Sequence, residues 1–371
     1  MKKPIIIVFV VILVIHLLGL TLFLLLQKKD NTDVDKDNAP ELIPEPILIP
    51  ESSAIPKSAK RVKNPRPSKS VKSSTQSTSV RKVSKSITAP SGGFFVPAKI
   101  PTFNFRGAVS GNLSAVPETK NASAGILVDL STGKVLWSKN AKKAVPIASM
   151  TKMMTVLIAV EDIRDGKMDY NQVIKVTKSA ASIGGSDIWL DPRESFPVKD
   201  LLKAILIKSA NDAAFLVGEY LGGGDINKFV ARMNSRAAAL GMHAKYFNPH
   251  GLPGKSLSKD NAATPEGLAK LAATLLQYPD VVKLSSTPIA YIDRKIGRNK
   301  KTMLTSTNKL VRSGVKGVDG MKTGYTRRAG FCLTATCRRD GRRMIAVVTG
   351  FRSSKERNTC VKKLLDWGYK R

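Results

Sequence analysis

The feature that most constrains the fold is an apolar segment, residues 153–160, directly after Ser149-Met150-Thr151-Lys152. Pro146 lies just before the segment and Asp165-Gly166 just after it, so we expect a helix over about 149–164. A helix that is apolar nearly all round needs packing neighbours on every side. The chain should therefore build a domain with this helix at its centre.

The start of this helix also carries chemistry. Ser149 and Lys152 are three residues apart and share a helix face, which continues into the apolar side chains of Val156 and Ala159. A lysine on that face is partly desolvated, which lowers its pKa and lets it accept a proton from a neighbouring hydroxyl. The positive end of the helix dipole favours the resulting alkoxide. Ser-x-x-Lys also occurs elsewhere in the chain, so it is the apolar helix that singles out Ser149 as a nucleophile and Lys152 as its base.

The charge of the chain restricts its partners. Its 371 residues include 61 Lys or Arg and 28 Asp or Glu, which gives a formal net charge of +33. Residues 111–371 carry +23 of this charge, because the first 110 residues contribute +10. Such an excess favours anionic lipid, an acidic polymer or nucleic acid as partner. The sequence has no zinc-finger, homeodomain or aromatic RNA-binding pattern, so we do not expect nucleic acid.

The cysteines and histidines predict neither a disulfide framework nor a metal or cofactor site. Cys332 and Cys337 are five residues apart on an expected strand and should face opposite sides, and Cys360 leaves the count odd. His243 and His250 are the only histidines after residue 116 and lack metal-ligand spacing. A Ser-His-Asp triad is not expected either.

The first 116 residues precede the expected domain. Residues 4–26 carry no charge and are long enough to span a bilayer, and they lack the cleavage site of a signal peptide, so we expect a single-pass anchor after a cytoplasmic tail 1–3. Residues 27–116 are rich in Pro, Ser and Lys and predict a disordered basic tether with a reach on the order of 50 Å. Phe94, Phe95, Phe103 and Phe105 are unusual in a tether, and docking of this segment on the domain is left open.

Periodicity and turn signals organise residues 117–371. A hairpin is expected at 125–138, and strands or strand ends at 288–292, 318–324, 330–337 and 343–349. Helices are expected at 198–206, 211–221, 225–240, 265–276 and 353–367. This order predicts an α/β (α+β) domain, an antiparallel sheet flanked by helices plus a helical subdomain.

Two further motifs follow Ser149. Ser209-Ala210-Asn211 lies at an expected helix break, and Lys322-Thr323-Gly324 lies on a late strand. Each tripeptide alone is weak, but all three motifs in this order are known from penicillin-binding proteins and class A β-lactamases.

The chain resembles the serine-type D-alanyl-D-alanine carboxypeptidases, the low-molecular-weight penicillin-binding proteins of the peptidase S11 family. The resemblance runs from about residue 122 to the C-terminus. It is carried by residues 146–155, 208–214, 248–253, 319–326 and 364–368, which include Asn248-Pro249-His250-Gly251 and Asp366-Trp367-Gly368. It implies a β-lactamase/DD-peptidase-like fold.

The resemblance also implies roles for individual residues. Ser149 would form an acyl-enzyme with the penultimate D-alanine, Lys152 would take its proton, and Ser209 would relay a proton to the leaving amine. Asn211 would hold the substrate's amide.

Four further positions would bind the rest of the substrate. Lys322 would keep the field positive, and Thr323 and Arg357 would bind the terminal carboxylate. The backbone N–H groups of Ser149 and Tyr325 would form the oxyanion hole.

The implied function is removal of the terminal D-alanine from peptidoglycan pentapeptide stems, which limits cross-linking, together with covalent binding of penicillin and other β-lactam antibiotics. The alternatives are a class A β-lactamase, for which no Glu-x-x-x-Asn stretch exists, a DD-endopeptidase and a non-catalytic wall-binding protein. Such a substrate would place the domain on the outer, periplasmic face of the cytoplasmic membrane. Anionic wall polymers or lipid phosphates are then the expected partners of its positive charge. The third stem residue and the oligomeric state stay open.

Overall fold

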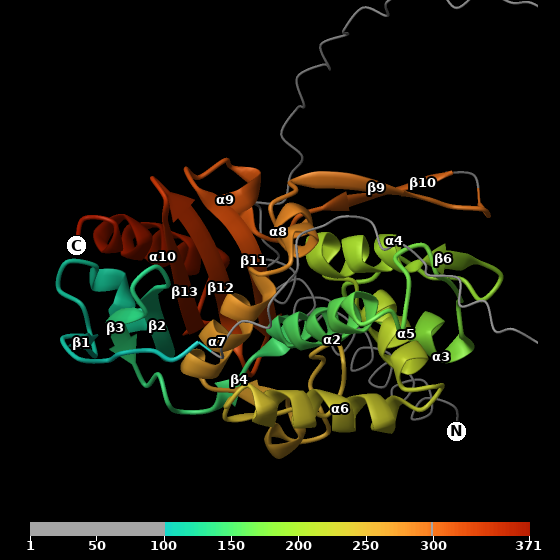
Figure 1. Ribbon diagram of the computed structural model, residues 1–371, viewed down its shortest axis with the longest axis horizontal. Coiled ribbons are helices and arrows are strands. Elements are labelled where there is room, and N and C mark those ends of the chain that lie inside the picture. The colour runs from blue at the N-terminus through green and yellow to red at the C-terminus, as the bar shows by residue number, and fades with distance from the viewer. Residues whose placement is uncertain (1–100, 298–299) are drawn as a thin grey trace, which may run out of the picture. The chain divides into compact units, whose positions relative to one another are not determined.

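A computed structural model describes residues 101–297 and 300–371 (Figure 1). The predicted tail 1–3, the predicted anchor 4–26 and the predicted tether up to residue 100 lie outside the described residues. Within the described part, no helix combines the length and the apolar character needed to cross a bilayer.

A six-stranded sheet has the strand order β1-β3-β2-β13-β12-β11. Its neighbouring strands are antiparallel except β1 and β3, which run parallel. The strands are β1 Val109–Ser110, β2 Ala124–Asp129, β3 Lys134–Lys139, β11 Val318–Thr326, β12 Gly330–Arg339 and β13 Arg342–Phe351. Because β2 pairs with β13, the early and late parts of the domain meet in the middle of this sheet. Asp340 and Gly341 form the turn between β12 and β13, and both have the positive φ that such a turn requires, 49° and 79°.

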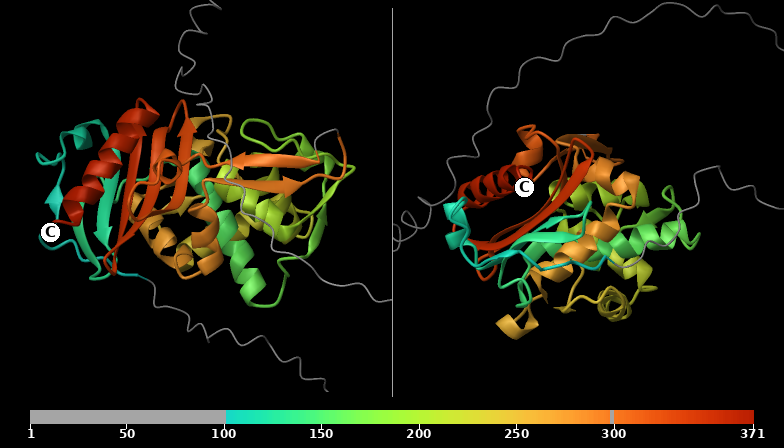
Figure 2. Two further views of the ribbon diagram at one scale, coloured as in Figure 1. Left: turned by 90° about the horizontal axis from the view of Figure 1, so that it is seen from above. Right: turned by 60° about the vertical axis from the view of Figure 1, so that its left-hand side comes forward.

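Both faces of the sheet are covered. Helix α10 (Ser354–Gly368) lies on one face and the helical part of the chain on the other (Figures 1 and 2). Successive side chains of β2 point to opposite faces of the sheet. Ile126 packs in the hydrophobic cluster shared with the helical subdomain, and Leu127 packs in the cluster beneath α10. Cys332 and Cys337 likewise pack on opposite faces, as predicted, and all three cysteines are free.

The helical subdomain surrounds α2 (Lys152–Arg164). Every residue from Lys152 to Val160 is buried, which confirms the predicted central helix. The α-helix begins later than predicted, because Ala148–Thr151 form a 3₁₀ turn that carries Ser149. The other helices are α3 Lys178–Ala181, α4 Val198–Lys203, α5 Asn211–Leu221, α6 Ile226–Ala239, α7 Pro265–Leu275, α8 Pro279–Ser285 and α9 Lys309–Arg312.

Short strands tie the loops around the helices together. The predicted strand at 288–292 is one arm of a hairpin that extends along the helical subdomain near α4 and β6 (Figure 1). The small sheets are β4 Val145–Pro146 with β8 Ala262–Ala263 and β7 Ala244–Lys245, β5 Val173–Lys175 with β6 Ser195–Pro197, and β9 Ile289–Asp293 with β10 Lys301–Thr305.

Residues 101–116 belong to the fold and not to the predicted tether. Strand β1 adds to the edge of the sheet with Val109 opposite Trp137, and Phe103 and Phe105 pack against the core. The order of this segment comes from contacts with residues distant in the sequence, which periodicity cannot reveal.

Candidate active site

Ser149 lies on a turn whose backbone is held in an unusual conformation. Ala148 has a φ of 46°, which is rare for a residue with a side chain. Gly251, from the loop between α6 and α7, packs directly on this turn, because a Cβ there would lie 2.0 Å from the Ala148 carbonyl oxygen. Only glycine permits that approach. The Asn248-Pro249-His250-Gly251 motif therefore supports the backbone in front of Ser149.

Lys152 is fully buried, and its amine is surrounded by three oxygens. Nζ lies 2.9 Å from Ser149 Oγ, 2.7 Å from Asn211 Oδ1 and 2.6 Å from the His250 carbonyl oxygen. Burial lowers the pKa of Lys152 well below its ordinary value, and the charge of Lys322 lowers it further, whereas Asp212 opposes the shift.

These contacts suit a neutral amine. An uncharged lysine has two N–H groups and one lone pair, and the oxygens of Asn211 and His250 can only accept hydrogen bonds. Asn211 Nδ2 donates to the Gly184 carbonyl at 2.8 Å, which turns Asn211 Oδ1 toward Lys152. The lone pair is then left for the hydroxyl of Ser149, the one partner of the three that can donate.

Ser209 and Lys322 form a second serine–lysine pair. Lys322 Nζ donates to Ser209 Oγ at 2.8 Å and to the Thr323 carbonyl oxygen at 3.1 Å. Ser209 ends a π-helical turn, Ala204–Lys208, and its left-handed φ of 68° marks the predicted break before α5. Burial and the charge of Arg357 lower the pKa of Lys322 to about 7.

Thr323 and Arg357 lie at the same end of the site. Thr323 Oγ1 lies 2.7 Å from Thr307 Oγ1, and the charge of Arg357 acts on Lys322. The Arg357 guanidinium is buried, contacts the Cys332 carbonyl oxygen at 3.2 Å, and has its pKa lowered to about 10 by that burial.

None of the three buried basic side chains of the site is ion-paired in the part of the chain that the structure describes. Within the described residues, Lys152, Lys322 and Arg357 form no ion pair with a carboxylate. A buried cation without a partner is costly, so such a group is typical of a site whose ligand brings the negative charge.

Strand β11 touches the turn that carries Ser149. A Cβ on Gly324 would lie 2.7 Å from the Ile147 carbonyl oxygen and 3.3 Å from Ala148 Cβ. This contact brings the peptide of Tyr325 next to the nucleophile turn, while the Tyr325 ring is exposed and stacks on Phe331. The two residues predicted to supply the oxyanion hole are thus on elements in direct contact.

Two contributors to the site were not predicted. His250 acts through its carbonyl oxygen, and burial together with Lys152 lowers its side-chain pKa to about 3, so the ring is neutral. Asp212 accepts hydrogen bonds from the backbone N–H groups of Ile188 and Leu190, at 3.1 and 3.0 Å, and holds that loop beside Asn211. Its position directly after the Ser-x-Asn motif was the only available signal.

No group of three metal-ligating side chains comes together within residues 101–297 and 300–371. The site consists instead of a serine, a buried lysine base, a second serine–lysine pair and a buried guanidinium. Together they define a serine–lysine site of the acyl-transfer class.

Comparison with known sequences gives the family. The model of the peptidase S11 family, D-alanyl-D-alanine carboxypeptidase, matches residues 112–353, and the chain therefore belongs to this family. The D-alanyl-D-alanine carboxypeptidase DacF of Bacillus subtilis is 38% identical over 249 residues, which cover 67% of this chain and 62% of DacF. DacC of Escherichia coli is 32% identical over 260 residues, 67% of this chain and 62% of DacC. The chain thus spans somewhat less than two thirds of the length of these relatives.

Solved structures agree on the fold. Penicillin-binding protein D2 from Listeria monocytogenes, in its ampicillin-bound form, superimposes with a TM-score of 0.59 and 28% identity. The match covers 67% of this chain and 97% of that chain. The predicted DD-peptidase-like α/β fold is confirmed.

Proposed function

We propose that this protein removes the terminal D-alanine from peptidoglycan pentapeptide stems through an acyl-enzyme on Ser149, and so limits cross-linking. The observation that carries the proposal is the contact between the buried Lys152 amine and Ser149 Oγ at 2.9 Å. The family membership and the named relatives support carboxypeptidase action over the β-lactamase and non-catalytic alternatives.

Acylation follows from the positions of the groups. Ser149 Oγ attacks the carbonyl carbon of the penultimate D-alanine while Lys152 Nζ takes the hydroxyl proton. The backbone N–H groups of Ser149 and Tyr325 stabilise the oxyanion, an effect for which one donor is typically worth about 10²–10³ in rate. The C–N bond then breaks, and the proton reaches the leaving amine through Ser209. Water, deprotonated by Lys152, hydrolyses the ester and restores the Ser149 hydroxyl.

The free carboxylate of the substrate supplies the missing negative charge. Lys322 and Arg357 are buried, and Thr323 adds a hydroxyl beside them. A terminal carboxylate would accept hydrogen bonds from Thr323 and Arg357 while Lys322 keeps the field positive. The site therefore favours a substrate that ends in a free carboxylate over an internal peptide.

β-Lactam antibiotics present the same pair of groups, a reactive carbonyl and a nearby carboxylate. We expect them to acylate Ser149, as supported by the ampicillin-bound form of the Listeria relative. The sequence lacks the Glu-x-x-x-Asn stretch that a class A β-lactamase uses for deacylation, so the adduct should be long-lived.

We also propose a location for the protein. Residues 4–26 would anchor it in the cytoplasmic membrane, with the domain on the outer face, where the peptidoglycan stems are.

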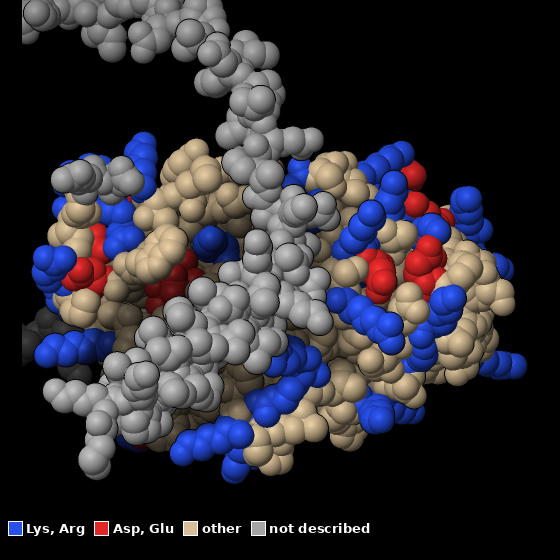
Figure 3. All heavy atoms as spheres, turned by 180° about the vertical axis from the view of Figure 1, so that it is seen from behind, with Lys and Arg blue, Asp and Glu red and all other residues tan. Residues whose placement is uncertain are grey.

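The surface charge suggests a further partner. Lys and Arg side chains are spread over the visible surface of one face, with Asp and Glu in small groups between them (Figure 3). Attraction to anionic wall polymers or lipid phosphates predicts retention on purified cell wall that weakens with salt. Salt-independent retention would contradict this part.

The decisive experiment is incubation of the full chain with a disaccharide pentapeptide and measurement of released D-alanine. Release by the wild type, with none from Ser149→Ala and no fluorescent penicillin adduct on that variant, is the expected result. Full release by Ser149→Ala would refute the assignment. Rapid turnover of penicillin would favour the β-lactamase alternative instead.

A further inference from the structure

A hollow of about 390 Å³ lies where the loop before β6 meets the hairpin β9–β10. Its lining includes Trp189, Asp191, Arg193, Arg294 and Thr302. None of these residues takes part in the proposed reaction. Trp189 is the largest of the apolar side chains that line it, and 72% of its surface is exposed.

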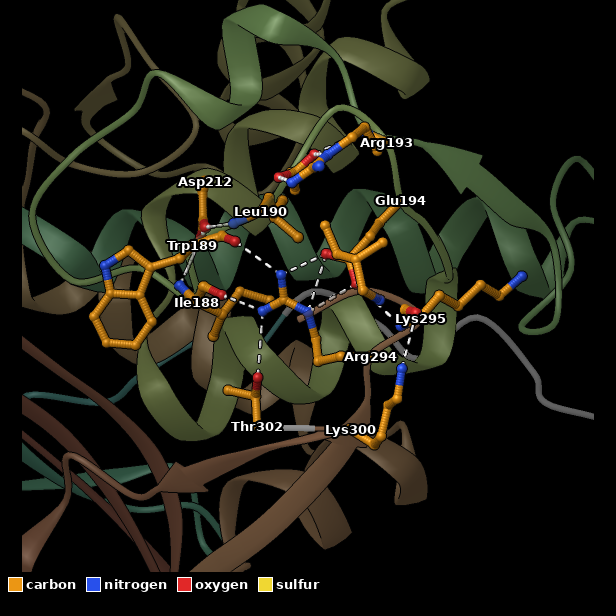
Figure 4. Close-up of polar contacts among 12 residues, drawn as sticks. Ile188, Trp189, Leu190, Arg193, Glu194, Asp212, Arg294, Lys295, Lys300 and Thr302 are labelled. Carbon is orange, nitrogen blue, oxygen red and sulfur yellow. Dashed lines mark hydrogen bonds and ion pairs between the residues drawn. The ribbon is translucent and has the colours of Figure 1, made fainter. Parts of the chain in front are cut away.

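Arg294 holds the backbone on one side of Trp189. Its guanidinium donates to the carbonyl oxygens of Ile188 and Trp189, at 2.8 and 2.9 Å, and pairs with Glu194. The carboxylate of Glu194 is almost fully buried, so this pair is a fixed part of the structure. Figure 4 shows the guanidinium at the centre of these contacts, with the indole of Trp189 lying outside them.

Asp212 holds the same backbone from the other side. It accepts the N–H groups of Ile188 and Leu190, so the residues on both sides of Trp189 are tied down. Trp189 itself has a φ of 52°, a conformation that L-residues rarely adopt. The fold thus holds an uncommon backbone in place and leaves the indole out of its core, which is typical of an aromatic side chain that contacts a ligand.

This segment begins at the catalytic centre. The Ser186 carbonyl accepts the Asn211 N–H at 2.6 Å, and a Cβ on Gly185 would lie 2.7 Å from Asn211 Nδ2. Asp212, which holds the residues around Trp189, is the next residue after Asn211. A substrate that extends from Asn211 along this segment therefore arrives at Trp189.

Each of the two arginines that line the hollow is paired with a carboxylate. Arg193 pairs with Asp191 at 2.8 Å and Arg294 pairs with Glu194, within a protein of net charge +33. A neutral ligand suits such a site better than an anion. The lining offers an aromatic face beside guanidinium, carboxylate and hydroxyl groups. A pyranose ring fits this combination, because the C–H groups on its face can contact the indole and the hydroxyls at its edge can bind the polar groups.

We infer that Trp189 and this hollow bind a sugar ring of the glycan strand to which the stem peptide is attached. The inference rests on the proposed function, because it names the part of that substrate beyond the peptide. The sugar ring would stack on the indole while its hydroxyls reach Asp191, Arg193 and Thr302. Glycan-linked stems would then be preferred over free peptides.

The test compares two substrates on the wild type and three variants of the full chain. Trp189→Ala should raise KM for the disaccharide pentapeptide between about 3- and 10-fold, and leave KM for the sugar-free pentapeptide unchanged. Trp189→Phe should largely restore the lower KM, because it keeps an aromatic face. Tyr220→Ala is the matched control, since Tyr220 is an exposed aromatic residue near the end of α5 and does not line the hollow. The rate of penicillin adduct formation should be the same in all forms.

An equal rise in KM for both substrates would overturn the sugar assignment in favour of a peptide contact, and no change in either would overturn it altogether. Direct binding separates this inference from the proposed function. The neutral disaccharide of N-acetylglucosamine should shift the tryptophan fluorescence of the wild type saturably and that of Trp189→Phe not at all. If no form releases D-alanine, the proposed reaction fails, and the fluorescence titration still decides on the sugar site.

Discussion

Two regions of this protein arrange their buried or partly buried basic side chains in opposite ways. At the nucleophile, Lys152, Lys322 and Arg357 are buried and lack an ion-paired carboxylate within the described residues. At the hollow, Arg294 is paired with a buried Glu194 and its remaining N–H groups hold backbone carbonyls.

The difference teaches what each region is built for. An uncompensated buried cation destabilises the fold, so it persists where a ligand supplies the negative charge or where a lowered pKa is needed. A guanidinium that is paired with a carboxylate stabilises the fold, and the pair has no net charge to offer a ligand. The first region therefore suits an anionic substrate terminus and the second a neutral one.

The largest effect is expected from loss of the base. Lys152→Met should slow acylation of Ser149 by about 10³–10⁴-fold, because Lys152 is the amine that contacts the Ser149 hydroxyl, at 2.9 Å. The rate of fluorescent penicillin adduct formation measures this effect. Lys167→Met, at an exposed lysine just after α2, is the control and should react normally. A Lys152→Met enzyme within tenfold of the wild type would show that another group takes the proton.

The second effect is a loss of folding stability when the ion pair between Arg294 and Glu194 is broken. Glu194→Gln leaves Arg294 buried without its counter-charge and should lower the free energy of unfolding by about 3–5 kcal/mol. Urea denaturation followed by circular dichroism measures it. Asp191→Asn breaks the exposed pair with Arg193 and should change stability little. Similar losses from the two variants would remove the contrast between buried and exposed pairs.

The third effect is a loss of catalytic efficiency when the buried Arg357, which forms no ion pair in the described part of the chain, is replaced. Arg357→Met should lower kcat/KM for a peptide ending in D-Ala-D-Ala by about 10- to 100-fold, since a charge-assisted hydrogen bond to the terminal carboxylate is lost. A substrate whose terminal carboxylate is amidated should be affected much less by the variant. Equal losses on both substrates would mean that Arg357 acts by supporting the fold.

The smallest effect is on the pH profile. Lys152 must be neutral, so kcat/KM should rise with pH through its lowered pKa. Lys322 should stay charged, and its pKa of about 7 makes kcat/KM fall above pH 7, by less than tenfold between pH 7 and 8. Arg357→Met removes a repelling charge, so it should raise the pKa of Lys322 and move the falling limb to higher pH. A falling limb that does not move would exclude this coupling.

Local patterns predicted a large part of the fold. The apolar run after Ser149, the hairpin at 125–138, the helix break at Ser209 and the Asp-Gly turn at Asp340 all depend on near neighbours and are confirmed. Docking of the phenylalanine segment was left open, and the edge strand β1 within residues 101–116 was not predicted, because such a strand is ordered by its partner β3.

The candidate site divides in the same way. Its serines and lysines follow from motifs and Arg357 from the family resemblance, whereas the His250 carbonyl and the contacts of Arg294 with Ile188 and Trp189 leave no trace in residue type. A backbone carbonyl is present at every position, so only its location in space makes it a partner.

The sequence by itself determined that one serine lies a turn away from a lysine on a buried helix, because helix periodicity and apolar burial act over short range. Tertiary structure alone decided that the lysine is buried without an ion pair in the described part of the chain. It also decided that Gly251 and Gly324 bring other segments against the serine turn, and that the Trp189 side chain is exposed. These outcomes depend on which distant segments meet, and burial and electrostatic interaction respond to distance in space rather than along the chain.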